Sequence, residues 1–147
     1  MHSRLRPGSC KAFSPRPRSS VTGAHLAPDR ISLSNMAFYA FHGVAPGEKR
    51  DGQRFFVDVD LYLDLREAAR SDDIKSTVDY EGVFHLIKTT VESQRFYLIE
   101  ALADHLAHAI LEGYSVERVV VRVRKPSVPI QGILDHTEVE VDRSRAK

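Results

Sequence analysis

The sequence predicts an α+β domain in which two helices cover one face of a four-stranded sheet. Between Phe55 and Leu65, apolar residues alternate with mostly acidic ones, the pattern of a strand with one buried face. Two segments with apolar residues at helical spacing follow, and valines at 119, 121 and 123 then restore the period of two. The order strand, strand, helix, helix, strand, strand is typical of this class.

A first strand is predicted over Ile31–Phe41, before the alternating segment. The loop between these strands contains Pro46, Gly47 and Gly52, which favour turns. Asn35 interrupts the pattern of the first strand, and we expect a β-bulge there.

Two helices are expected in the middle of the chain. Asp79 can cap the first helix, and we expect Gly113 to end the second. The first apolar stripe consists of Tyr80, Val83, Phe84, Ile87 and Val91, and the second of Leu98, Ala101, Leu102, Leu106, Ala109 and Ile110.

The last two strands are expected over Val119–Lys125, which Pro126 ends, and from about His136 to Asp142. The second and third strands carry opposite charges on their polar faces. If the two strands are neighbours, these charges help to set their register. The residues concerned are Asp58, Asp60 and Asp64 on one strand and Arg122 and Arg124 on the other.

Composition excludes several classes of function. The chain of 147 residues fits one domain, and its net charge of +1 gives no sign of a nucleic-acid or membrane partner. A single cysteine, Cys10, forms neither an internal disulfide nor a cysteine metal site. No apolar run reaches the ~20 residues that span a bilayer. We therefore expect a soluble, cytoplasmic protein.

Residues 1–28 differ from the rest, because they are rich in arginine, serine and proline and contain no acidic residue before Asp29. Such a segment buries little apolar surface, and we expect a disordered basic extension ahead of a folded domain over residues 29–147. The composition is also that of an organellar transit peptide, which leaves an organellar location as an alternative. We favour an extension without a targeting role.

Five fragments occur in series from about Asp29 to the C-terminus: FYAFHG at 38–43 with Glu48 and GQRFFVDVDLYLDL at 52–65, SDD at 71–73, TVDY at 77–80, LIE at 98–100 and RVRKP at 122–126. Together they resemble the dihydroneopterin aldolase family of folate biosynthesis. The resemblance implies the T-fold, an antiparallel sheet that pairs edge strands between subunits to close wide barrels. It also implies a homo-oligomer, a tetramer or octamer, that splits 7,8-dihydroneopterin into 6-hydroxymethyl-7,8-dihydropterin and glycolaldehyde without metal or other cofactor.

Lys125 is the first candidate catalytic residue. It shares strand parity with Val119, Val121 and Val123, so its stem leaves the sheet on the apolar side. Apolar surroundings disfavour an ammonium and make a neutral amine available for proton transfer. An isolated lysine at a strand end more often extends its amine to solvent, but the KP motif of the resemblance favours catalysis.

The other candidates take their roles from the resemblance. Glu100 anchors the pterin ring, and its place in the first turns of the second helix favours an ionised carboxylate. Ile99 and Val78 lie at the substrate, the latter in an extended stretch that presents backbone groups. Tyr80 reaches a neighbouring subunit's pocket and assists proton transfer, and Glu48 holds the reacting hydroxyls or a water.

Histidines offer a rival interpretation as a metal site. His105 and His108 lie one helical turn apart, with His42 and His85 elsewhere. We favour surface histidines, because a lone helical pair is poor support for zinc.

Two positions depart from the family pattern. Tyr97 stands where many relatives carry asparagine, and DHTEVEV stands where a glycine and valine are usual before the last strand. There, Thr137 or Glu138 could narrow the pocket.

Three alternative functions remain open at this point. An epimerase would use the same cleavage and rejoin the fragments inverted. An oxygenase is disfavoured because Tyr80 is intact, and a non-catalytic pterin-binding barrel protein would not require Lys125 or Glu100.

Overall fold

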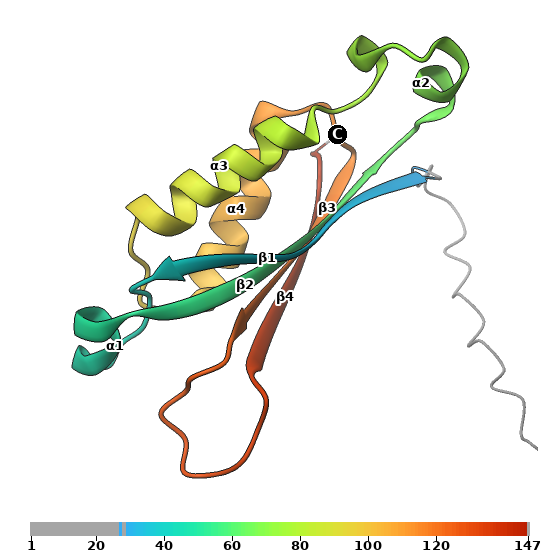
Figure 1. The fold of residues 1–147 in the computed structure, drawn as a ribbon. Helices are drawn as coiled ribbons and strands as arrows, with labels where there is room; N and C mark the ends of the chain where they lie inside the picture. Colours follow the sequence, from blue (N-terminus) through green and yellow to red (C-terminus); the bar gives the residue numbers. More distant parts are fainter. Residues whose placement is uncertain (1–26, 28, 147) are drawn as a thin grey trace, which may run out of the picture.

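The computed structural model describes residues 27 and 29–146, so the expectations for residues 1–28 lie almost wholly outside the described residues. The rest forms the predicted α+β domain, a four-stranded antiparallel sheet in the order β1-β2-β3-β4 with helices on one face (Figure 1). The strands are β1 (Asp29–Ala40), β2 (Gln53–Leu63), β3 (Arg118–Lys125) and β4 (Thr137–Ser144). The helices are α1 (Pro46–Asp51), α2 (Arg66–Ser71), the 3₁₀ turn η1 (Ile74–Ser76), α3 (Tyr80–Ser93) and α4 (Ile99–Gly113).

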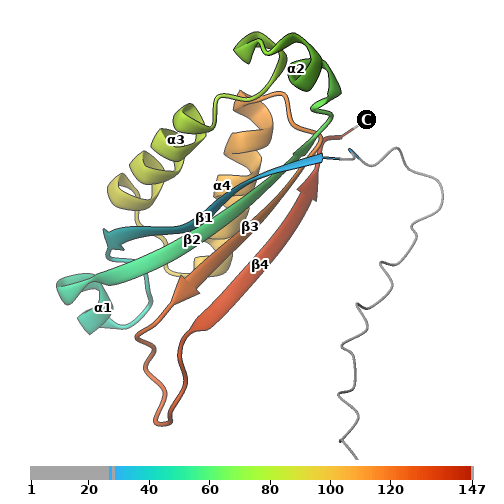
Figure 2. The same ribbon diagram turned by 45° about the vertical axis from the view of Figure 1, so that its right-hand side comes forward.

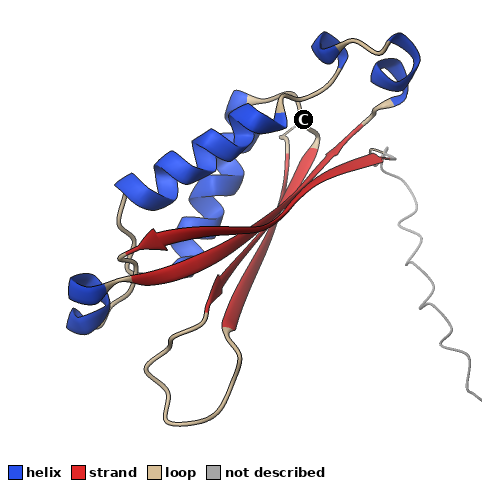
Figure 3. Cartoon of the chain, viewed as in Figure 1, coloured by secondary structure: helices blue, strands red, loops and turns tan. Residues whose placement is uncertain are grey.

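The sheet twists strongly, and no helix of residues 29–146 lies on its second face (Figures 2 and 3). Helix α3 packs over β1, while α4 packs over β3 and β4. The connection from β3 to β4 extends beyond the sheet, on the side of the molecule where α1 lies (Figure 1). Both α1 and this connection therefore stand at one end of the helix layer.

The core lies between the sheet and the two long helices. Alternation along β2 directs its apolar side chains inward, as predicted, because successive side chains point to opposite faces. Both helices present buried stripes, with Val83, Ile87 and Val91 from α3 and Leu102, Leu106 and Ile110 from α4 fully enclosed. From the sheet they meet Phe55, Val57, Val59, Leu61, Val119, Val121 and Val123.

Two sequence expectations about the connections were wrong. The loop after β1 contains a short helix, α1, and two further short elements, α2 and η1, follow β2. Strand β2 ends at Leu63, two residues earlier than predicted, because Leu65 precedes α2. The expectation that Gly113 ends the second long helix is confirmed, because Gly113 is the last residue of α4 and Tyr114 is the C-cap.

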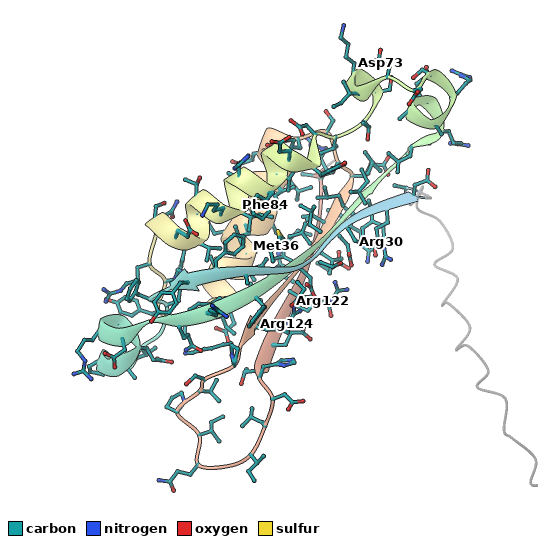
Figure 4. The ribbon with its side chains drawn as sticks, in the orientation of Figure 1. Arg30, Met36, Asp73, Phe84, Arg122 and Arg124 are labelled. Atoms are coloured by element: carbon teal, nitrogen blue, oxygen red, sulfur yellow. The ribbon has the colours of Figure 1, made fainter. Side chains whose placement is uncertain are left out.

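The predicted bulge and the expected charge pairs between strands are largely present. Asn35 has φ +57°, and the β1–β2 register shifts between Leu33 and Met36. Arg122 pairs with Asp60 at 2.8 Å, and Arg124 pairs with Asp58, both on the face without helices (Figure 4). Asp64 was assigned wrongly to this set, because it lies beyond β2.

Asp64 pairs instead with Arg66 at 2.6 Å. This local pair lies at the start of α2 and replaces the expected contact across strands. The pKa of Asp64 falls to about 2 because Arg66 hydrogen-bonds its exposed carboxylate.

Candidate active site

Glu48 lies in the first turn of α1, a helix that begins at Pro46. The residue at this turn can accept a hydrogen bond from the free N–H ahead of the helix, and Oε2 of Glu48 does so from Ala45 at 3.1 Å. A Cβ at Gly43 would lie only 2.2 Å from the same oxygen, and Gly43 has φ +144°. Glycine is therefore required at position 43 for the carboxylate to occupy this position.

Lys125 is the last residue of β3, and its stem follows the buried valines on the helix-covered face, as predicted. Its side chain is 12% exposed and forms an ion pair with Oε1 of Glu48, which is 14% exposed. Besides this ion pair, Oε1 has no hydrogen-bond partner among the described residues. It therefore retains capacity to accept a bond from a hydroxyl or a water.

The electrostatics of the pair differ from the sequence expectation. Strand parity predicted apolar surroundings for Lys125, whereas the structure also places a carboxylate against the amine. Burial alone raises the pKa of Glu48, but the contact with Lys125 and the Ala45 N–H outweigh it, so that pKa lies below its ordinary value. The Glu48 carboxylate is thus held ionised beside the amine.

A pocket of about 490 Å³ opens beside this pair. It is lined by Glu48 and Lys125 on one side and by Ile99 and Glu100, from the start of α4, on another. Glu100 lies in the first turn of α4, as expected, where the helix dipole favours a carboxylate. One chain therefore brings together four of the predicted site residues.

The remaining two predicted residues, Val78 and Tyr80, do not line this pocket. Tyr80 is the first residue of α3, at the end of the helix layer near α2, whereas α1 lies at the opposite end (Figure 1). Tyr80 is 59% exposed as a residue, while Val78 is buried. Asp79 between them caps α3 as predicted, accepting bonds from Glu81 N and Gly82 N.

His42 is a structural residue whose role the sequence did not indicate. It is fully buried; its Nδ1 accepts a bond from Phe96 N, and its Nε2 lies 3.0 Å from the carbonyl of Val91. Burial, with the nearby charges of Arg95 and Lys125, lowers the pKa of His42 despite the opposing bond to Val91. The neutral ring satisfies both contacts and fixes the segment before Glu48 against the end of α3 and the connection that leads to α4.

The other histidines of the metal hypothesis lie apart from the pocket. The His105 ring packs at a tilt against that of Phe96, with 5.4 Å between the ring centroids, while His108 lies close to Asp104. Among residues 27 and 29–146, no group of three or more histidine, cysteine or acidic side chains is placed to hold a metal ion. Within the same range, no helix combines the length and apolar character needed to cross a membrane.

Both positions that depart from the family pattern bear on the pocket. Tyr97 lines it, with Nζ of Lys49 lying 4.4 Å from the ring centroid. Thr137 also lines it, whereas Glu138 pairs with Arg124 on the other face of the sheet. Of the two residues expected to narrow the pocket, only Thr137 is placed to do so.

Sequence reasoning missed several parts of the pocket. The β3–β4 connection supplies a wall made of Val128, Pro129 and Ile130. The close contact of Gly43 with the Glu48 carboxylate was also not predicted, although a glycine five residues before a candidate acid can indicate such a close approach. The connection carries only turn residues and scattered apolar ones, and its fold depends on contacts distant in sequence.

The sheet order, the helices on one face and a pocket with a paired lysine and glutamate are those of an enzyme subunit of the T-fold class. The family model for FolB, dihydroneopterin aldolase, matches residues 31–142. A dihydroneopterin aldolase of Methylorubrum extorquens is 41% identical over 80% of this chain and 92% of its own length. The chain therefore belongs to the dihydroneopterin aldolase family, the carbon–carbon lyases that cleave 7,8-dihydroneopterin in folate biosynthesis.

Solved structures agree with this fold. A Burkholderia thailendensis dihydroneopterin aldolase bound to guanine has a TM-score of 0.66 and 28% identity, covering 80% of this chain and 92% of that one. The E. coli dihydroneopterin aldolase in complex with neopterin has a TM-score of 0.73 and 24% identity, covering 79% and 99% respectively.

Proposed function

We propose that the pocket beside Glu48 and Lys125 is the active site in which this chain cleaves 7,8-dihydroneopterin. The observation that carries the proposal is the buried ion pair of these two residues at the edge of a pocket of about 490 Å³. Buried charges that line a pocket are a common mark of catalytic groups.

The reaction breaks the bond between C1′ and C2′ of the substrate side chain. A base removes the proton of the C2′ hydroxyl, C2′ becomes the aldehyde carbon of glycolaldehyde, and the bonding electrons pass to the ring through C6 to N5. Protonation of C1′ then gives 6-hydroxymethyl-7,8-dihydropterin. Because the N5=C6 imine accepts the electrons, neither a lysine Schiff base nor a metal is needed as the electron sink.

Lys125 exchanges the proton with the C2′ hydroxyl, and Glu48 orients the hydroxyls. The available acceptor capacity of Oε1 of Glu48 supports this role, because a substrate hydroxyl can donate to it. The largely buried amine of Lys125 then lies within the same cluster of polar groups.

Glu100 binds the pterin ring. Its carboxylate can accept two parallel bonds from the ring's amino group and adjacent N–H, and guanine, bound by the Burkholderia relative, carries the same donor pair. Ile99 is buried at the pocket wall and offers an apolar surface to the ring.

A neighbouring subunit supplies Tyr80, with Val78 beside it, in a tetramer or octamer. The exposure of Tyr80 and its distance along α3 from the pocket support this role, because one chain alone does not bring it to Lys125. The Tyr80 hydroxyl assists protonation of C1′.

The test is incubation of the purified protein with 7,8-dihydroneopterin and excess EDTA, followed by product analysis. We expect equal amounts of glycolaldehyde and 6-hydroxymethyl-7,8-dihydropterin. Dihydromonapterin as the sole product would identify an epimerase instead. Loss of turnover that zinc restores would contradict the metal-free mechanism.

A further inference from the structure

Strand β3, which carries Lys125, stops pairing with β2 one residue before Lys125. The β2–β3 ladder ends at the pair Phe56–Arg124, so Lys125 has no ladder partner on β2. On the other side it pairs with Thr137 of β4, an edge strand. At Lys125, backbone hydrogen bonds therefore hold β3 only on the side of β4.

A side chain replaces the missing ladder. Nε2 of Gln53 donates to the carbonyl of Ser127 at 2.8 Å, and Ser127 N donates to Oε1 of Gln53 at 2.9 Å. One amide thus matches both backbone groups of one residue, as a paired strand residue would. Lys125 lies between this amide clamp and the last ladder pair.

The amide clamp joins the two segments that carry the ion pair. Gln53 is the first residue of β2, five residues after Glu48 and directly after the α1 C-cap, Gly52. Ser127 lies two residues after Lys125 and begins the connection whose Val128 and Pro129 line the pocket. A second hollow of about 320 Å³ lies next to the clamp and shares Glu48 with the pocket.

We propose that Gln53 is a positioning residue for the cleavage, which holds the Lys125 amine against Glu48 by clamping Ser127. It touches no reacting atom. Because a misplacement of about 1 Å can reduce a rate by on the order of 10²-fold, loss of the clamp affects turnover more than ring binding. The proposal rests on the roles proposed above for Lys125 and Glu48.

The test compares Gln53→Met, which keeps the length of the side chain and removes both hydrogen bonds, with Gln131→Met as control. Gln131 lies exposed in the same β3–β4 connection and does not line the pocket. We expect Gln53→Met to lower the single-turnover cleavage rate roughly 10–100-fold while the Kd for neopterin stays within about twofold. Gln131→Met should match the parent protein in both measurements.

Gln53→Glu provides a second variant, because it keeps the acceptor for Ser127 N and loses the donor. Its rate should fall between those of the parent and Gln53→Met. When Gln53→Met is added to Lys125→Ala, the cleavage rate should fall little below that of Lys125→Ala alone, since the clamp acts through the amine. The proposal is overturned if Gln53→Met turns over normally, if neopterin binding falls as much as the rate, or if neither Gln53 variant folds. Normal turnover of Lys125→Ala would instead overturn the proposed catalytic roles.

Discussion

At the scale of single residues, the buried pair of Lys125 and Glu48 has a stability cost that a structural role alone does not explain. Both side chains are mostly removed from water, and desolvation of two charges often exceeds their attraction. An apolar pair of similar size would fill the space equally well. The pair therefore points to chemistry at this position.

Substitutions of Lys125 and Glu100 should fail differently. Lys125→Ala should lower the chemical rate by roughly 10²–10⁴-fold, the usual range for acid–base catalysis, with little change in pterin binding. Glu100→Ala should weaken binding first, because the ring is held equally in the ground and transition states. Calorimetric titration with neopterin and single-turnover rates separate these effects. A Lys125→Ala protein that binds poorly but reacts normally at saturation would show that Lys125 is a binding residue.

His42 should make stability depend on pH. Its pKa is lowered in the folded protein, so below its ordinary value of 6.5 the unfolded chain binds more protons than the folded one. Stability is therefore complete above about pH 6.5 and falls as pH drops towards the folded pKa, with a slope of at most about 1.4 kcal/mol per pH unit.

Urea unfolding of the parent protein and His42→Gln between pH 7.5 and 5.5 measures this slope. The substitution should remove the contribution, while His85→Gln at an exposed position of α3 should keep it. Equal slopes in the parent and His42→Gln would contradict the assignment of a buried neutral ring.

At the scale of elements, the N-cap of α3 links stability to the position of Tyr80. Asp79→Ala removes bonds to two free N–H groups and should lower the free energy of unfolding by about 1 kcal/mol. Loss of the cap should loosen the first turn of α3, which begins with Tyr80, so turnover should also fall. Asp73→Ala, at the cap of the three-residue turn η1, is the matched control and should change turnover less. Denaturation at one protein concentration and steady-state rates measure both effects.

The long strands and helices were predictable because the spacing of apolar residues in the sequence directly indicates which face of each element is buried. The alternation in β2 and the stripes of α3 and α4 match the faces that meet in the core. The short helices α1 and α2 have no buried residues, so no apolar period indicates them. The wrong end of β2 has another cause: Leu65 continues the apolar alternation and packs against the core, although it lies beyond the end of the strand.

The candidate site was predictable in part. Glu48, Glu100 and Lys125 could be chosen from motifs, and the chain brings them together. The contacts that hold them, such as His42 on Val91 and Gln53 on Ser127, join residues that are distant in sequence. Neither a period nor local spacing identifies such pairs, so they required the three-dimensional structure.

At the scale of the whole molecule, two features of the described residues indicate contacts with further subunits. Strands β1 and β4 are sheet edges, and natural proteins commonly cover or pair such edges. Tyr80 stands exposed at the opposite end of the helix layer from the pocket. A ring of subunits in which edge strands pair would cover the two edges and could bring Tyr80 of one subunit to the pocket of another.

Removal of residues 1–28 should leave assembly and turnover nearly unchanged. Strand β1 begins at Asp29, and the core cluster consists of residues from Met36 onward. Size-exclusion chromatography and steady-state rates of the truncated protein measure this. An insoluble or monomeric product would show that the extension belongs to the fold.

The most direct test of the shared site is complementation between two inactive variants. Lys125→Ala and Tyr80→Ala subunits, co-expressed with different tags and purified through both, should regain activity at about a quarter of the sites if they mix at random, because a mixed interface can combine an intact Lys125 with an intact Tyr80. Lys125→Ala with Glu48→Ala is the control, and it should stay inactive, since both residues belong to the pocket of one chain. Activity in the control pair, or none in the first pair despite mixed assembly, would contradict a site built from Lys125 and Glu48 of one subunit and Tyr80 of another.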